Sequence, residues 1–198
     1  MATRRSRARP AVWLDVAVKV ALAATLLAML AAPGLREFSA RGVAGRVAAA
    51  IVALVVVPAW WVSWGRRRSR HGYPFALDAV LALPFLIELW ARPAGVPELA
   101  GGGQVRHAVN FALLATAVAL VLARLELPPR QAAALVLAGC AAAAVLWELL
   151  EDLTFASGGA LWNADSLADV ALALAAAAGV AVATGLVLAR RDREPPGT

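Results

Sequence analysis

The sequence predicts an all-α protein, a bundle of about six membrane-spanning helices with both termini in the cytoplasm. Hydrophobic residues make up 62% of the 198 residues and charged residues only 16%, whereas a soluble domain usually carries about 25% charged residues. The apolar residues form blocks near twenty residues long, the length needed to cross roughly 30 Å of hydrocarbon. Arginines gather in the short segments between these blocks, where basic residues set the topology.

Six apolar blocks define the predicted spans, which cover residues 11–32, 43–64, 74–91, 105–124, 129–150 and 167–189. A basic N-terminus (1–10) precedes this transmembrane domain (11–189), and a short tail (190–198) follows it. The third span is the shortest and contains Pro84, which we expect to kink it. The first block also has features of a cleavable signal peptide, but Asp15 and Lys19 interrupt it, so we expect it to remain as a span.

The arginine distribution predicts the orientation in the membrane. With the N-terminus inside, cytoplasmic segments hold thirteen arginines and the opposite side holds five, while the single lysine lies within a span. This bias favours cytoplasmic termini. Arginine-rich and alanine-rich composition is typical of a GC-rich bacterial coding sequence, so we expect a multi-pass protein of the bacterial cytoplasmic membrane.

Other classes of protein fit the composition poorly. The formal net charge of +6 and the pI near 11.1 raise the question of nucleic acid binding, but the arginines lie in short flanks between apolar blocks, so we predict the lipid bilayer as partner and no nucleic acid. Cys140 is the only cysteine and lies inside an apolar block, which excludes a disulfide framework and a cysteine metal site.

Small residues recur at every fourth position in the last two spans. The sixth span has Ala171, Ala175, Gly179 and Ala183 at this spacing, and the fifth has Ala134, Ala138 and Ala142. Such rows let helix backbones approach closely in lipid. We therefore expect these faces to pack, either within the bundle or against a second copy or another membrane protein.

Polar residues cluster at the ends of the spans that the topology assigns to the extracytoplasmic side. Five are candidate site residues and three are secondary candidates. The first group is His107, Glu148, Glu151, Asp165 and Asp169, and the second is Glu88, Asn110 and Asp152. Helical spacings of three and four place Glu148 on one face with Glu151 and Asp152, and Asp165 on one face with Asp169.

Two kinds of chemistry suit this set. Carboxylates bind hard divalent cations, and one histidine beside them also admits Zn²⁺ or Fe²⁺. Alternatively, clustered carboxylates repel one another, so that one of them holds a proton and passes it on. The catalytic residues, the metal and its identity are left open by the sequence.

Structural roles compete with these functions. Asp165 or Ser166 would serve as the N-cap of the last span, and Glu151 and Asp152 would be solvated beyond the membrane edge. Toward the cytoplasmic side, Asp15 and Lys19 (i,i+4) predict a structural ion pair. We assign no chemistry to Asp78, a first-turn acid of its helix.

Three short motifs resemble those of the YjdF-like inner-membrane proteins and, more distantly, the VanZ-like proteins. They are "RHAVNF" opening one helix, "LWELLEDL" closing the next, and "NADSLADVALALAAAAG". The resemblance covers residues 105–180 and matches His107, Trp147-Glu148, Glu151, Asp165 and Asp169. Val105-Arg106 replaces the acidic-basic pair that the family has before the histidine, and Ser166 stands where threonine is usual. The resemblance implies no substrate, because the family is largely uncharacterised.

Three functions remain open from the sequence. We expect an envelope-associated or accessory membrane protein with an acidic and histidine cluster. The alternatives are a metal-dependent membrane enzyme acting on a lipid-linked or extracytoplasmic substrate, and a small transporter coupled to protons or cations. Whether the protein is an enzyme at all is not decided by these residues.

Overall fold

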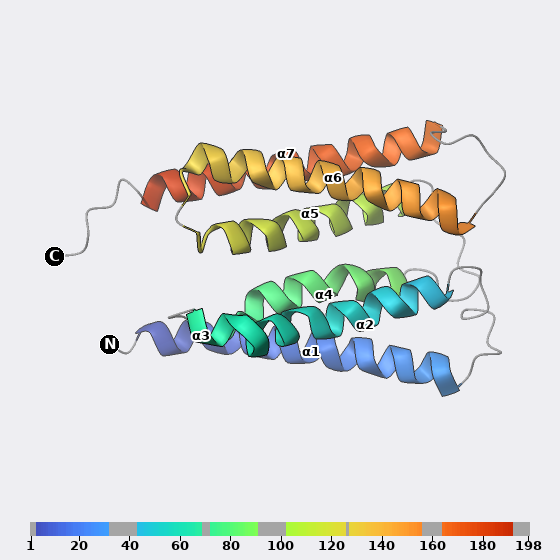
Figure 1. Ribbon diagram of the computed structural model, residues 1–198, viewed down its shortest axis with the longest axis horizontal. Coiled ribbons are helices and arrows are strands. Elements are labelled where there is room, and N and C mark those ends of the chain that lie inside the picture. Colours follow the sequence, from blue (N-terminus) through green and yellow to red (C-terminus); the bar gives the residue numbers. More distant parts are fainter. Residues whose placement is uncertain are drawn as a thin grey trace. The chain divides into compact units, whose positions relative to one another are not determined.

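The computed structural model describes residues 3–31, 43–68, 72–90, 102–125, 127–155 and 164–191. Their regular structure is entirely helical (Figure 1). The elements are α1 (Thr3–Ala31), α2 (Val43–Trp60), the π-helical turn η2 (Trp61–Gly65), α3 (Arg66–Arg68), α4 (Phe75–Trp90), α5 (Gly102–Leu122), α6 (Pro129–Phe155) and α7 (Ala164–Arg191). The predicted all-helical class is confirmed.

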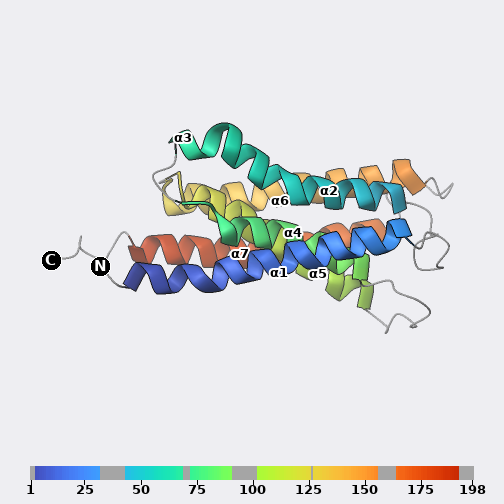
Figure 2. The same cartoon turned by 90° about the horizontal axis from the view of Figure 1, so that it is seen from below.

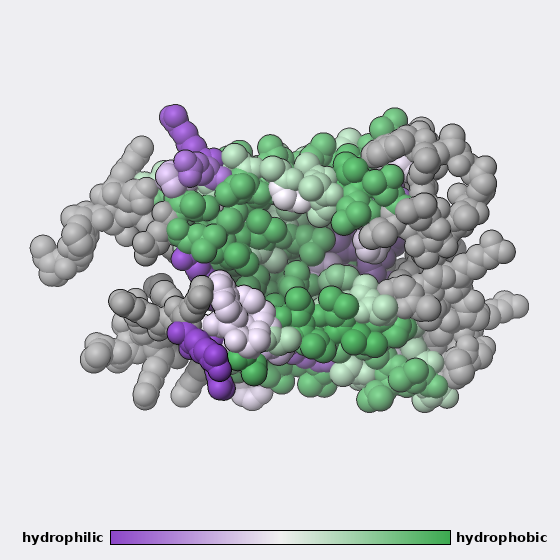
Figure 3. All heavy atoms as spheres, viewed as in Figure 1, coloured by the Kyte–Doolittle hydropathy of each residue, from purple (hydrophilic) through white to green (hydrophobic). Residues whose placement is uncertain are grey.

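Five helices are long and apolar enough to cross a membrane, and each coincides with a predicted span. These stretches are Pro10–Ala31, Val47–Gly65, Gly103–Leu122, Pro129–Leu149 and Ser166–Arg190. The predicted third span is also helical, as α4, and continues through Pro84. Its 16 residues reach only about 24 Å, less than the hydrocarbon thickness of roughly 30 Å. Apolar side chains cover most of the described surface visible in Figure 3. The chain is therefore a multi-pass membrane protein.

The chain divides into two compact units, residues 1–97 and 98–198. In the first unit, α4 packs against both α1 and α2 (Figures 1 and 2). Its core contains Val18, Leu22, Leu26 and Met29 of α1 together with Ala50 of α2 and Ala82 of α4. The α1 residues repeat at three- and four-residue intervals, so one face of this helix is buried against its neighbours.

The end of α2 departs from regular α-helical geometry. Pro58 lies inside α2 and lacks the backbone N–H that the preceding turn would bond. The next five residues form the π-helical turn η2, in which the N–H of Arg66 donates to the carbonyl of Trp61. A Cβ at Gly65 would lie only 2.7 Å from the Trp61 ring. Glycine therefore lets the indole lie over the backbone at this turn.

In the second unit, α7 packs against both α5 and α6, which also contact each other. One row of small residues on α7 is buried, namely Ala173, Ala177 and Ala181. The facing row on α6 comprises Ala132, Val136, Cys140 and Ala144. Residues of both rows join Ala115 or Phe111 of α5 in the core.

The rows predicted for the last two helices therefore do not pack within the second unit, and their packing against a second copy or another membrane protein stays a prediction. Ala171, Ala175, Gly179 and Ala183 of α7 are all exposed, as are Ala134, Ala138 and Ala142 of α6. A Cβ added at Gly179 would meet no atom within 4 Å, so this glycine makes no close helix contact. In an alanine-rich helix several rows of small residues repeat at four-residue intervals, so this spacing does not distinguish the row that turns inward.

Candidate functional site

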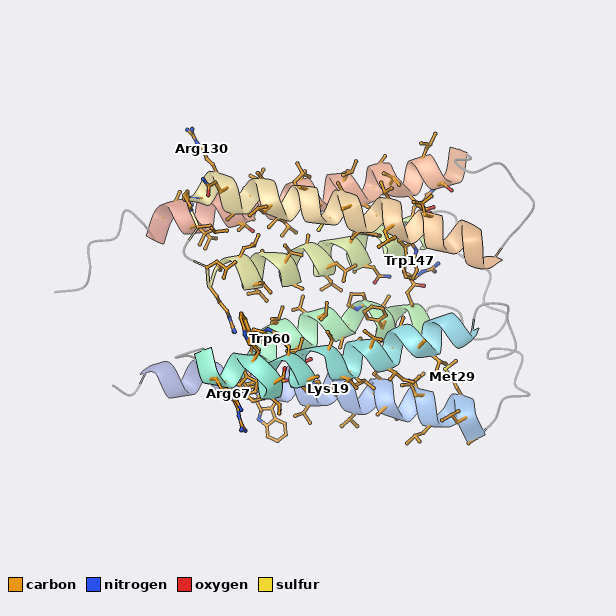
Figure 4. All side chains as sticks on the ribbon, viewed as in Figure 1. Lys19, Met29, Trp60, Arg67, Arg130 and Trp147 are labelled. Carbon is orange, nitrogen blue, oxygen red and sulfur yellow. The ribbon has the colours of Figure 1, made fainter. Side chains whose placement is uncertain are left out.

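The second unit brings three of the five primary candidate residues together. His107 lies near the start of α5, Glu148 near the end of α6 and Asp169 near the start of α7. One ligand atom from each lies within 4.8 Å of the other two. Because α5 and α7 begin where α6 ends, all three side chains meet at the same end of this unit. Figure 4 marks this end of α6 with Trp147 and the opposite end with Arg130.

An apolar layer supports this polar triad from one helical turn away. Phe111 follows His107 by four residues, Ala173 follows Asp169 by four, and Ala144 precedes Glu148 by four. The three apolar residues form a buried cluster. The triad is therefore the last layer of the buried rows that hold α5, α6 and α7 together, and the helix packing fixes its spacing.

The His107 ring packs against this layer and turns one nitrogen inward. Its ring centroid lies 4.8 Å from that of Phe111, four residues on, with the planes tilted by 33°. The Nε2 atom is buried and has no hydrogen-bond partner among the described residues. A buried polar atom without a partner costs about 1–3 kcal/mol. A bound ion at Nε2 would offset that cost.

The charges in the triad also favour a cation. Glu148 is buried, with 6% of its surface exposed, and Asp169 and His107 are half-buried. Two carboxylates this close repel each other, and charges withdrawn from water are costly unless they are paired. A divalent ion would neutralise both carboxylates and accept the imidazole nitrogen as a third ligand.

Donor separation in the triad is near that of a metal site. Tetrahedral ligands with bonds of about 2.1 Å lie roughly 3.4 Å apart. The three atoms lie within 4.8 Å of one another, so they would move closer together to hold an ion. These three protein ligands would leave at least one coordination position for water or substrate, as in catalytic zinc sites.

The remaining candidates have different outcomes. Asn110 is buried on α5, three residues after His107. Glu88 is half-buried near the end of α4 and belongs to the first unit. Helix α6 continues beyond the predicted span end at residue 150 to Phe155, so it includes Glu151 and Asp152. Asp165 lies in α7. The side chains of these last three residues lie outside the described part of the structure.

The predicted N-cap at Asp165 or Ser166 is placed too far along the chain. Helix α7 begins at Ala164, so both residues lie in its first turn. Ser166 is buried there.

A second polar cluster lies in the first unit, and the sequence reasoning found only part of it. The predicted ion pair is present, with Lys19 Nζ 3.4 Å from Asp15 Oδ2. Lys19 also forms an ion pair with Asp78 of α4, whose side chain is fully buried. The Tyr73 hydroxyl donates a hydrogen bond to the same Asp78 oxygen, Oδ2. Asp78, which received no chemical role from the sequence, is thus the centre of the cluster.

Tyr73 is held in its neutral form. Burial, the hydrogen bond to Asp78 and the charges of Asp78 and Asp15 raise the pKa of its phenol well above the ordinary value. Lys19 Nζ lies 5.5 Å from the centre of the Tyr73 ring. Trp61 packs edge-on against the same tyrosine, with ring centroids 5.9 Å apart. The hydroxyl therefore remains a donor to Asp78 throughout the physiological pH range.

An apolar cavity of about 490 Å³ lies elsewhere in the second unit. It is formed between the start of α6 and the end of α7 and is lined by residues including Pro129, Ala133, Ala181 and Gly185. Its lining contains no histidine and no carboxylate. The cavity is therefore separate from the triad, which lies at the other ends of these helices.

No family model, no curated protein and no solved structure matches the chain. The resemblance of residues 105–180 to the YjdF-like and VanZ-like proteins therefore stays a prediction. We infer the function from the geometry of the described residues.

Proposed function

We propose that this multi-pass membrane protein is an envelope-associated or accessory protein of the bacterial cytoplasmic membrane. It would bind a divalent metal ion through His107, Glu148 and Asp169. The observation that carries the proposal is the convergence of one imidazole nitrogen and two carboxylates from three helices, within 4.8 Å of one another. The buried Nε2 of His107, without a hydrogen-bond partner among the described residues, supplies the third ligand.

The donor set favours a transition ion. An imidazole is a good ligand for Zn²⁺, Fe²⁺ and Mn²⁺, whereas Mg²⁺ and Ca²⁺ prefer sites made of oxygen alone. The buried carboxylate of Glu148 adds charge in a region of low dielectric, where its attraction to a divalent ion is strong. We therefore expect a transition metal to compete successfully with Mg²⁺.

Metal analysis of the purified protein tests the proposal. We expect close to one transition ion per chain in the wild type and at least a tenfold loss of affinity in Glu148→Gln and Asp169→Asn, because each removes a charged ligand. The tail substitution Glu194→Gln makes the same chemical change outside the predicted spans and should bind like the wild type. Metal removal by a chelator should also lower the Tm of the wild type but not of Glu148→Gln.

A folded wild-type protein that takes up no ion from Zn²⁺, Mn²⁺ or Fe²⁺ solutions would refute the metal site. Equal binding by the wild type and by both ligand variants would refute the assignment of these residues. Circular dichroism of each variant separates loss of a ligand from loss of the fold.

The second candidate function, a metal-dependent membrane enzyme, is favoured by the number of ligands. Three protein ligands leave room for a metal-bound water, which a metal activates as a nucleophile. Loading the same preparation with Mn²⁺ and measuring water-proton relaxation tests for that water. Fast exchange of a bound water supports the enzyme, and a saturated coordination shell contradicts it.

A further inference from the structure

The cluster of Asp15, Lys19, Tyr73 and Asp78 in the first unit has no part in the proposed metal site. It joins α1 to the start of α4 across 59 positions of sequence. Asp15 lies inside a membrane-spanning stretch, Pro10–Ala31, and only 3% of its surface is exposed. Asp78 has no exposed surface. Ionisable groups so placed are costly in a membrane protein and call for a functional explanation.

The hydrogen bonds in this cluster are unevenly distributed between the two carboxylates. Asp78 Oδ2 receives both the Lys19 ammonium and the Tyr73 hydroxyl. Asp15 Oδ2 has only the longer contact to Lys19, at 3.4 Å. The second oxygen of each residue, Oδ1, is buried without a hydrogen-bond partner among the described residues. Asp15 is therefore the more weakly stabilised of the two carboxylates.

The charges do not balance if both acids are ionised. Lys19 carries one positive charge, Tyr73 is neutral, and the two aspartates together carry two negative charges. Among the described residues, the groups that act on Asp15 are Lys19 on its own helix and Asp78 on α4, and Tyr73 contacts both Lys19 and Asp78. An uncompensated buried charge costs several kcal/mol. One additional positive charge restores neutrality.

We propose that Asp15 is a proton-binding site, and that its proton supplies the missing positive charge beside the Lys19–Asp78 ion pair. The proton would sit on Oδ1 of Asp15, while Oδ2 still accepts the hydrogen bond from the Lys19 ammonium. Lys19 and Tyr73 both donate to Asp78, whereas Asp15 has only the longer contact to Lys19. Lys19 keeps 23% of its side chain exposed, so the cluster borders the surface of the unit.

Infrared spectroscopy of protein with isotope-labelled aspartate tests the proposal directly, since a protonated carboxyl has a carbonyl band that a carboxylate lacks. We expect this band in the wild type at neutral pH and its loss at alkaline pH. The band should be absent in Asp15→Asn, which removes the acid. It should also be absent in Asp78→Asn, because Lys19 then neutralises Asp15 alone.

Removing the positive charge of Lys19 should strengthen the infrared band of the protonated carboxyl instead of abolishing it. In Lys19→Met both acids lose their cation, so both should hold protons and the band should grow about twofold. Asp165→Asn, in the second unit, leaves the cluster unchanged and serves as the matched control for the Asp-to-Asn change. Because these residues are separate from the metal ligands, the result is independent of metal binding.

Two results would overturn the proposal. One is the absence of a protonated aspartate band in folded wild-type protein at neutral pH. The other is a band of wild-type size in folded Asp15→Asn or Asp78→Asn. If Lys19→Met does not fold, either Asp15→Asn or Asp78→Asn alone tests the proposal.

Discussion

Single side chains in the two polar clusters show two ways of balancing charge inside an apolar helical unit. In the first unit, the ammonium of Lys19 lies between two aspartates, and Tyr73 donates to one of them. In the second unit, Glu148 and Asp169 meet at an imidazole instead of a lysine. Two carboxylates beside an imidazole are the donor set of the divalent ion proposed above, whereas the lysine of the first cluster is itself a cation.

Tyr73 offers a direct measurement of the first cluster, because it is the only tyrosine in the chain. We expect its phenolate absorbance to stay absent in the folded protein at pH values near 10, where a free tyrosine is half ionised. The reason is the raised pKa of the phenol, caused first by burial and then by Asp78. Unfolding at the same pH should produce the phenolate signal at once.

The raised pKa of Tyr73 also determines how the folding stability depends on pH. Because the folded state disfavours the phenolate, the contribution of Tyr73 to folding is complete below pH 10 and is lost as the pH rises through the folded pKa. Asp78→Asn should lower the pKa of Tyr73 but leave it above the ordinary value, since burial remains. Ionisation of Tyr73 near pH 10 in the folded wild type would contradict the contact.

At the level of helices, each member of the second unit carries one buried row that ends in a polar residue. On α7 the row runs from Asp169 through Ala173, Ala177 and Ala181 at four-residue intervals. On α6, Glu148 continues the row that passes through Ala144 and Cys140. Side chains four residues apart lie above one another on a helix, so packing of the apolar part fixes where the polar ends meet.

Paired substitutions on α7 test which row is in contact. Ala177→Leu introduces extra volume into the cluster of Ala115, Val136 and Cys140 and should destabilise the protein by about 1–3 kcal/mol. Ala175→Leu makes the same change on the exposed row and should leave the Tm within a degree or two. Thermal unfolding in detergent compares the two variants.

The metal readout adds a second check on these variants. If the rows fix the triad, Ala177→Leu should also weaken metal binding, while Ala175→Leu should not. A larger loss of stability in Ala175→Leu than in Ala177→Leu would show that the row predicted first from the sequence is the packing face after all.

At the scale of the whole molecule, two helical units share one chain that crosses the membrane several times. Within the described parts of the chain, five stretches are long and apolar enough to span it, and α4 is shorter. The arginine bias, thirteen against five, predicts which side each segment faces. On that prediction the triad of His107, Glu148 and Asp169 faces the extracytoplasmic side.

Cysteine labelling tests this orientation. Cys140 is buried and is first replaced by alanine, after which single cysteines are introduced as Ser157→Cys and Ser69→Cys. A membrane-impermeant maleimide added to intact bacteria should label Ser157→Cys, which lies between the last two predicted spans. It should label Ser69→Cys only after the membrane is opened. The reverse pattern would place the triad on the cytoplasmic side.

The sequence by itself determined the helices and the ends at which their polar residues lie. Hydropathy over twenty residues is a local property, so the sequence alone is enough to place a span. The predicted spans 129–150 and 167–189 fall within α6 and α7. Placing His107, Glu148 and Asp169 at the same end needed only the alternation of span direction. Assigning a metal to them remains a proposal that the structure makes more specific.

Only the tertiary structure decided which faces of the helices meet and which distant residues become partners. The local sequence did not distinguish the row of Ala173 from the row of Ala171, because alanine occupies both. Asp78 also read as an ordinary first-turn acid, since its partner Lys19 lies 59 residues away. Helix rotation and pairing depend on the packing of all the elements in a unit, and that packing joins residues whose local surroundings give no sign of the contact.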